Sequence, residues 1–210
     1  MTRVMLVDDH AVVRVGFRML LQAAPDIQVV AEADSGEAAC QKYAEAAPDV
    51  VVMDLAMPGM GGIEAVRRIL ARDPRARILA LSAHEDTAHP RRVLKAGALG
   101  YLSKRSAPEA LIEAVLAVAA RQRYLDPAIA QRLAMEELAG SQDPVKALSE
   151  REFEVFIQLA KGQSVAQIAE NLKLSPNTVG THLYNVKQKL GAANQAELTL
   201  IALNHGLIGA

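Results

Sequence analysis

Several apolar runs in this sequence end on residues whose side chains could do chemistry. Asp8 and Asp9 follow RVMLV, Asp54 follows DVVVM, Ser82 follows ARILAL, and Lys104 comes shortly after ALGYL. An unpaired carboxylate costs several kcal/mol to desolvate, so burial alone does not explain an acid at the end of a core segment. These polar ends predict a functional site.

The residue types indicate what such a site could bind. Three carboxylates close together repel one another unless a cation lies among them, and hard oxygen ligands with room for water suit Mg²⁺. A lysine and a serine at the same edge supply a fixed positive charge and a hydroxyl donor, which suit a phosphoryl group on Asp54. We therefore predict a Mg²⁺-dependent phosphoryl site built from Asp8, Asp9, Asp54, Ser82 and Lys104.

The elements that must bring these residues together alternate along the chain. Short β-branched runs predict strands over 3–7, 27–33, 49–53, 76–81 and 98–102. Helical patterns follow them over 11–23, 35–46, 62–72, 88–96 and 107–120. Five strand–helix units of this spacing predict an α/β domain with a doubly wound, five-stranded parallel sheet. In such a sheet, ligands bind beyond the carboxyl ends of the strands.

After residue 121 we expect no further strands. Asp126 and Pro127 supply a cap and a first residue for a connecting helix through Leu138, and AGSQDP (139–144) is typical of a linker. The last 66 residues have only helical patterns. Ser149 and Glu152 have capping-box spacing, and SPNTVGTHLYNVKQKLG (175–191) opens a helix directly after a short turn. This order predicts a small all-α helix-turn-helix domain.

Composition limits the class of protein. Charged residues make up 22% of the chain and the formal net charge is −1, which excludes a disordered tail or a uniformly basic protein. The single Cys40 excludes an internal disulfide framework, and we expect it to pack in the core. The start MTRVMLVDDH meets acids too early for a signal peptide, and no apolar segment reaches 18 residues. We expect a soluble, cytoplasmic protein that does not enter a membrane.

The chain resembles bacterial two-component response regulators of the NarL/FixJ family, which carry a LuxR-type helix-turn-helix. The resemblance covers nearly the whole chain and rests on DD at 8–9, MD at 53–54, MPGMGG at 57–62, LSAH at 81–84, GYLSK at 100–104, then LSERE, QIAENL and SPNTVGTHLYNVKQKLG. Within the family, DDHAVVRVGFRMLL, EADSGEAA, RQRYLDPAIAQRLA and ELTLIALNHGLI are most similar to GacA/UvrY-type regulators. The resemblance implies a receiver domain over 1–121 with flavodoxin/CheY-like strand order 2-1-3-4-5, a helical linker over 122–144 and a DNA-binding domain over 145–210.

The same resemblance assigns roles in the receiver. Asp54 would accept a phosphoryl group from a sensor histidine kinase, as a phosphoacceptor rather than a turnover enzyme. Asp9 would contact Mg²⁺ directly and Asp8 through water, and the Ala56 carbonyl would also face the metal. Ser82 and Lys104 would then hold the phosphoryl oxygens. Tyr101 matches the aromatic switch position, although it could also be an ordinary half-buried strand residue.

In the C-terminal domain we expect Val179, Leu183, Val186 and Leu190 to face the core, because their spacing places them on one side of a helix. We predict that Thr181 and Tyr184 read base edges of promoter DNA. The residues expected near phosphates are Asn177, Thr178, His182, Lys187 and Lys189. Gly180 departs from many relatives, which carry a longer polar or basic side chain there. Activation is expected to produce a homodimer.

Three alternatives remain. A haloacid-dehalogenase-type phosphatase also uses a strand-end aspartate, but it needs a second acid where Ala56 stands. A signalling module without DNA output would lack the C-terminal helices. A regulator independent of phosphorylation would usually lose an acid or the lysine, and all of them are present. We therefore predict a phosphorylation-controlled, DNA-binding transcription regulator.

Overall fold

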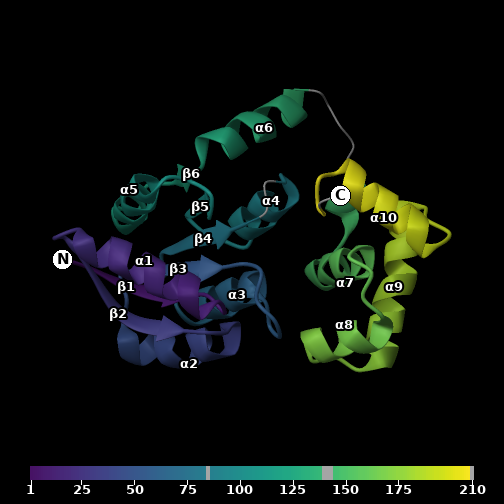
Figure 1. Cartoon of the computed structure of the whole chain (residues 1–210), viewed down its shortest axis with the longest axis horizontal. Helices are drawn as coiled ribbons and strands as arrows, with labels where there is room; N and C mark the ends of the chain where they lie inside the picture. Colours follow the sequence, from purple (N-terminus) through teal and green to yellow (C-terminus); the bar gives the residue numbers. More distant parts are fainter. Residues whose placement is uncertain (84–85, 139–143, 209–210) are drawn as a thin grey trace. The chain divides into compact units, whose positions relative to one another are not determined.

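A computed structural model of the chain describes residues 1–83, 86–138 and 144–208. The chain divides into two compact units, and Figure 1 shows the elements of each. The first unit comprises Met1–Ala83 and Pro90–Ala130, and the second comprises the described residues of His84–His89 and Gln131–Ala210. The linker expected at 139–144 lies outside the described residues except for Pro144.

The first unit is a parallel sheet with helices between its strands. The strands are β1 (Thr2–Val7), β2 (Ile27–Ala33), β3 (Val50–Asp54), β4 (Ile78–Ser82), β5 (Gly100–Ser103) and β6 (Tyr124–Leu125). The helices are α1 (Ala11–Ala23), α2 (Gly36–Ala46), α3 (Gly62–Arg72), α4 (Ala88–Lys95), which belongs to this unit from Pro90 onward, and α5 (Pro108–Ala119). The strand order is β2-β1-β3-β4-β5-β6, and every pairing is parallel. The predicted α/β class and the core order 2-1-3-4-5 are confirmed.

The sheet is buried on both faces, as the continuous apolar strands predict. On one face, Leu21 of α1 and Leu111 and Val115 of α5 pack against alternate strand residues such as Val52 and Leu79. The alternate residues on the other face are also buried, and α2 and α3 lie beside each other there (Figure 1). Cys40 is buried on α2, as expected, with Sγ 4.0 Å from Met60 Sδ.

The expectation that strands end at residue 121 is wrong. Tyr124 and Leu125 form β6, which pairs with Gly100 and Tyr101 of β5 and gives the sheet a sixth strand. The helix expected from Pro127 to Leu138 is confirmed as α6 (Pro127–Leu138), which follows β6 after one residue (Figure 1). The side chain of Asp126 accepts hydrogen bonds from the backbone N–H groups of Ala128 and Ile129 and so caps this helix.

The second unit is helical after α6. It contains a 3₁₀ turn η1 (Pro144–Ala147), α7 (Glu150–Ala160), α8 (Val165–Leu172), α9 (Pro176–Leu190) and α10 (Gln195–Asn204). Ser149 and Glu152 form the predicted capping box of α7, and Ser164 and Gln167 form another at α8. Ser175 caps α9, with Pro176 as its first residue, as predicted. None of the helices in the described residues combines the length and the apolar character that a bilayer crossing requires.

Candidate phosphoryl site and nucleic-acid interface

The predicted acidic residues meet at the carboxyl end of the sheet. Asp8 follows β1 and Asp54 ends β3, which pair side by side with Val7 opposite Met53. Ser82 ends the neighbouring strand β4, and its carbonyl accepts a hydrogen bond of 2.8 Å from the backbone N–H of Lys104. The parallel topology therefore brings residues nearly one hundred positions apart in the sequence to one edge.

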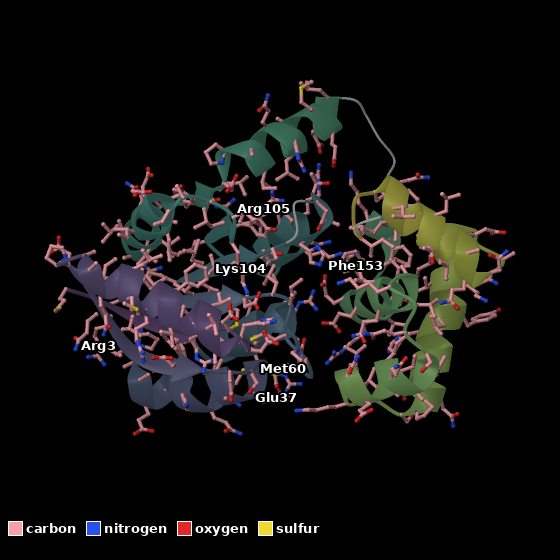
Figure 2. The ribbon with its side chains drawn as sticks, in the orientation of Figure 1. Arg3, Glu37, Met60, Lys104, Arg105 and Phe153 are labelled. Carbon is pink, nitrogen blue, oxygen red and sulfur yellow. The ribbon has the colours of Figure 1, made fainter. Side chains whose placement is uncertain are left out.

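Lys104 joins the two buried carboxylates. Its Nζ lies 2.6 Å from Asp8 Oδ2 and 2.8 Å from Asp54 Oδ2. Both aspartate side chains are almost completely buried, and the lysine side chain is largely covered (Figure 2 labels it). Asp54 Oδ1 accepts a 3.2 Å hydrogen bond from the N–H of Ala56, and Asp8 Oδ1 accepts one of 2.9 Å from His10. The carboxylates are thus fixed in position.

Burial and the contacts between Lys104 and the two carboxylates have opposite effects on the pKa values of Asp54 and Lys104. Burial raises the pKa of Asp54 above its ordinary value, and the ammonium of Lys104 offsets only part of that rise. For Lys104, burial alone would lower the pKa, but the contacts with Asp54 and Asp8 outweigh it and raise the pKa. The lysine therefore stays charged and supplies the positive charge that favours ionised carboxylates.

The same carboxylates fit a divalent cation. Asp8, Asp9, His10 and Asp54 each offer a ligand atom, and these atoms lie within 4.8 Å of one another. Asp9 Oδ1 and Asp54 Oδ2 are buried oxygens, and a nitrogen of the His10 ring or of Lys104, respectively, lies 2.8 Å away. A hard cation would satisfy such oxygens. His10 lies at the rim, where it precedes α1 and its ring is mostly exposed.

Steric constraints explain the glycines in the loop after Asp54. A Cβ on Gly62 would lie 2.0 Å from the carbonyl oxygen of Asp54, so any side chain there would push the acidic strand end out of place. Gly59 and Gly61 adopt φ values of 81° and 72°, which favour glycine. The motif MPGMGG thus allows α3 to begin directly against the backbone of Asp54.

The two remaining receiver residues are buried. Ser82 and Tyr101 both have no exposed surface. Tyr101 lies between Ala80 of β4 and Leu125 of β6 in the sheet register. The alternative of a half-buried strand aromatic does not describe it, because its side chain is wholly inside. Sequence reasoning missed β6, which covers this part of β5.

In the second unit, α8 and α9 form the helix-turn-helix. Val179 and Val186 are buried, and Leu183 and Leu190 pack partly buried against the same core, as the helical spacing predicts. Asn177, Thr178, Gly180, Thr181 and Tyr184 are exposed, whereas His182 and Lys187 are half-buried. A Cβ on Gly180 would meet nothing within 4 Å. The predicted reading face is therefore open on α9.

Lys189 has a partner that the sequence did not indicate. Its Nζ lies 2.6 Å from Oε2 of Glu152, a buried residue of α7 that also accepts a 2.8 Å hydrogen bond from the backbone N–H of Ser149. The two residues are 37 positions apart, so no local pattern could reveal the pair. Glu152 thereby caps α7 and anchors α9 at the same time.

Comparison with known proteins defines the class of this architecture. Residues 4–116 match the family model "Response regulator receiver domain", and residues 146–202 match "Bacterial regulatory proteins, luxR family". The chain therefore belongs to the two-component response regulators with a LuxR-type DNA-binding domain, which are transcription regulators. The class predicted from the sequence is confirmed.

The chain is also similar to particular members of this family. The chain is 41% identical to the response regulator GacA of Pseudomonas viridiflava, covering 100% of this chain and 99% of that protein. It is 42% identical to the response regulator UvrY of Escherichia coli K12, covering 100% and 97%. The structure of RcsB from Salmonella enterica serovar Typhimurium bound to the rprA promoter with phosphomimetic BeF3⁻ is similar over 95% of this chain and 97% of that one, at 28% identity and a TM-score of 0.73. The predicted similarity to GacA/UvrY-type regulators is confirmed.

Proposed function

We propose that Asp54 accepts a phosphoryl group from a sensor histidine kinase and that this modification controls DNA binding by the chain. The observation that carries the proposal is the contact of one largely covered lysine with two buried strand-end carboxylates. Asp54 ends β3, which lies between β1 and β4 in the sheet, and the positive charge of Lys104 favours its ionised form and offsets part of the effect of burial. An anionic, fixed carboxylate is a suitable nucleophile for a phosphohistidine donor.

We infer that the resident metal is Mg²⁺, held by Asp9, Asp8, Asp54 and the carbonyl of Ala56. When bound, Mg²⁺ neutralises negative charge that develops on the transferred phosphoryl group. The support is the close spacing of the ligand atoms that Asp8, Asp9, His10 and Asp54 offer, all of which lie within 4.8 Å of one another. Asp8 is already bonded to Lys104 and to the N–H of His10, which favours a water-mediated role for it.

We further propose that Ser82, Tyr101 and Lys104 form the switch. After phosphoryl transfer, Lys104 would exchange a carboxylate oxygen of Asp54 for a phosphoryl oxygen, and the hydroxyl of Ser82 would donate to another. Tyr101 lies on the strand beside Ser82 and is buried, so a shift of β4 changes its packing directly. The modification biases an existing active state only through these differential contacts.

For DNA, we propose that Thr181 and Tyr184 face base edges and that Asn177, Thr178, His182 and Lys187 lie near phosphates. Tyr184 is 65% exposed, and Thr181 Oγ1 is bonded within its own helix to the carbonyl of Asn177. Lys189, also predicted near a phosphate, is bonded to Glu152. We therefore infer that it mainly holds α9 on α7. We expect two copies of the chain to bind inverted half-sites.

The test of the acceptor is Asp54→Asn, which keeps the shape and removes the nucleophile. Labelling by acetyl phosphate should disappear while the thermal unfolding of the protein shows a folded chain. Asp9→Ala is the companion variant, and its labelling should no longer rise with added Mg²⁺. Labelling of Asp54→Asn at the wild-type level would refute the assignment.

A further inference from the structure

Asp126 is a buried carboxylate that the phosphoryl site does not use. Only 6% of the residue is exposed, and it stands between the short strand β6 and the start of α6. Its backbone N–H donates a 2.9 Å hydrogen bond to the carbonyl of Tyr101 on β5. Its two carboxylate oxygens have different partners, and each partner belongs to a different part of the unit.

One oxygen reaches the loop that carries Lys104. Ser106 Oγ donates a 2.6 Å hydrogen bond to Asp126 Oδ2. Ser106 is two residues after Lys104 and closes a tight turn, because its N–H donates to the carbonyl of Ser103 at 3.1 Å. The backbone N–H of Arg105 donates to the hydroxyl of Ser103, which further restrains the turn (Figure 2 labels Lys104 and Arg105). Lys104 and Ser106 therefore belong to one restrained turn.

The other oxygen holds the first turn of α6. Asp126 Oδ1 accepts hydrogen bonds from the N–H groups of Ala128 at 3.0 Å and Ile129 at 3.4 Å. Ile129 is buried, which fixes this end of the helix in the first unit. The helix begins in the first unit and its residues from Gln131 onward belong to the second. Asp126 thus connects the Lys104 turn with the helix that leads to the DNA-binding domain.

We propose that Ser106 and Asp126 are positioning residues that couple the state of the phosphoryl site to the start of α6. The proposal rests on the proposed phosphorylation of Asp54. When Lys104 leaves the carboxylate oxygen of Asp54 for a phosphoryl oxygen, the turn ending at Ser106 moves with it. The short hydrogen bond to Asp126 lengthens, and the cap on α6 loosens.

The two functions of this carboxylate can be separated by substitution. Ser106→Ala removes the connection to the turn and leaves both capping bonds of Asp126. Asp126→Ser keeps a good helix cap but is too short to reach Ser106 as well. Asp126→Asn is the conservative control, because its amide can cap the helix with its oxygen and donate to the Ser106 hydroxyl with its nitrogen.

The experiment is amide hydrogen exchange of the full chain, followed by mass spectrometry, with and without acetyl phosphate and Mg²⁺. Intact mass reports the fraction phosphorylated in the same samples, and thermal unfolding checks that each variant is folded. In the wild type, exchange at Ala128 and Ile129 should accelerate roughly two- to tenfold on phosphorylation, the range for one net hydrogen bond. Asp126→Asn should respond likewise, and Ser106→Ala and Asp126→Ser should show equal rates before and after.

The outcomes are distinguishable. If amide exchange at Ala128 and Ile129 accelerates in Ser106→Ala or Asp126→Ser as much as in the wild type, at equal phosphorylation, the coupling is overturned. The coupling is also overturned if the wild type becomes fully phosphorylated and the amide exchange at the start of α6 does not change. In that case the proposed function stands. Failure of the wild type to gain the mass of a phosphoryl group overturns the proposed function and the coupling together.

Discussion

Replacement of Lys189 by alanine should destabilise the DNA-binding domain. The lysine is the cation paired with Glu152, whose side chain is only 6% exposed. Lys189→Ala leaves that carboxylate inside the domain with the Ser149 N–H at 2.8 Å as its main donor. A buried charge that loses its partner is costly, because water cannot replace the missing ammonium.

The magnitude follows from the exposure of the two side chains. Breaking a fully buried pair by removing one partner costs about 3–5 kcal/mol. The Lys189 side chain is 39% exposed, so solvent already screens part of the attraction. A hydrogen bond to a charged group contributes about 1.5–3 kcal/mol, and the screened value here should be about 1–3 kcal/mol. For a domain of this size, each kcal/mol lowers the melting temperature by about 4–8 °C.

Calorimetry of the full chain measures this loss, because the helical unit should unfold as a cooperative transition of its own. The matched control is Lys187→Ala on the same helix, whose ammonium makes no ion pair within the described residues. Lys187→Ala should leave stability within about 0.5 kcal/mol. Equal melting temperatures for the two variants would refute the reasoning, since the Glu152 contact would then contribute nothing.

The pair also predicts a pH dependence. Burial raises the pKa of Glu152, but the bonds from Lys189 and Ser149 outweigh it, so the pKa lies below its ordinary value of 4.5. A carboxylate with a lowered pKa in the folded state stabilises the fold above its unfolded pKa, and this stabilisation is lost as the pH falls through the folded value. Wild-type stability should therefore decrease below pH 4.5. In Lys189→Ala this acid-induced loss should be smaller, because burial then raises the pKa of Glu152 with less opposition and protonation relieves the buried charge.

Further predictions concern four single positions. Gly180→Ala should raise domain stability by about 0.5–1 kcal/mol in thermal unfolding, and Gly16→Ala should do the same in the receiver, because a Cβ at either meets nothing within 4 Å. Tyr184→Ala should change stability by less than about 0.5 kcal/mol and alter the bases recovered by selection from a random DNA library. Gly62→Ala should destabilise the receiver by about 1–3 kcal/mol and slow acetyl phosphate labelling of Asp54, since its Cβ would lie 2.0 Å from the Asp54 carbonyl oxygen.

The elements with strong local patterns were predictable from the sequence. The expected helices over 11–23 and 62–72 and the strand over 27–33 have the bounds seen in the structure. The strand β6 was missed because two residues carry no periodicity, and its existence depends on pairing with β5. The start of β5 was placed at 98 instead of Gly100, because Ala98 is as apolar as the strand itself.

The candidate site was predictable where topology alone brings residues together. Asp8, Asp54 and Ser82 end neighbouring parallel strands, so their proximity follows from the strand order. The pairing of Lys189 with Glu152 depends on how α7 and α9 pack, and no residue spacing in the chain encodes it. The sequence also does not encode the distances between Lys104 and the carboxylates or the burial of those carboxylates, and these decide how tightly each carboxylate is held.

The short strand β6 has a practical consequence for isolating the receiver. A fragment that stops at residue 121, where the strand patterns end, would lack the partner of Gly100 and Tyr101 and leave the outer edge of β5 open. Unpaired strand edges invite association with other chains. A fragment that continues through Ala130 retains this pairing and the first turn of α6, with Ile129 in the core. The longer fragment is therefore the one expected to remain monodisperse in solution.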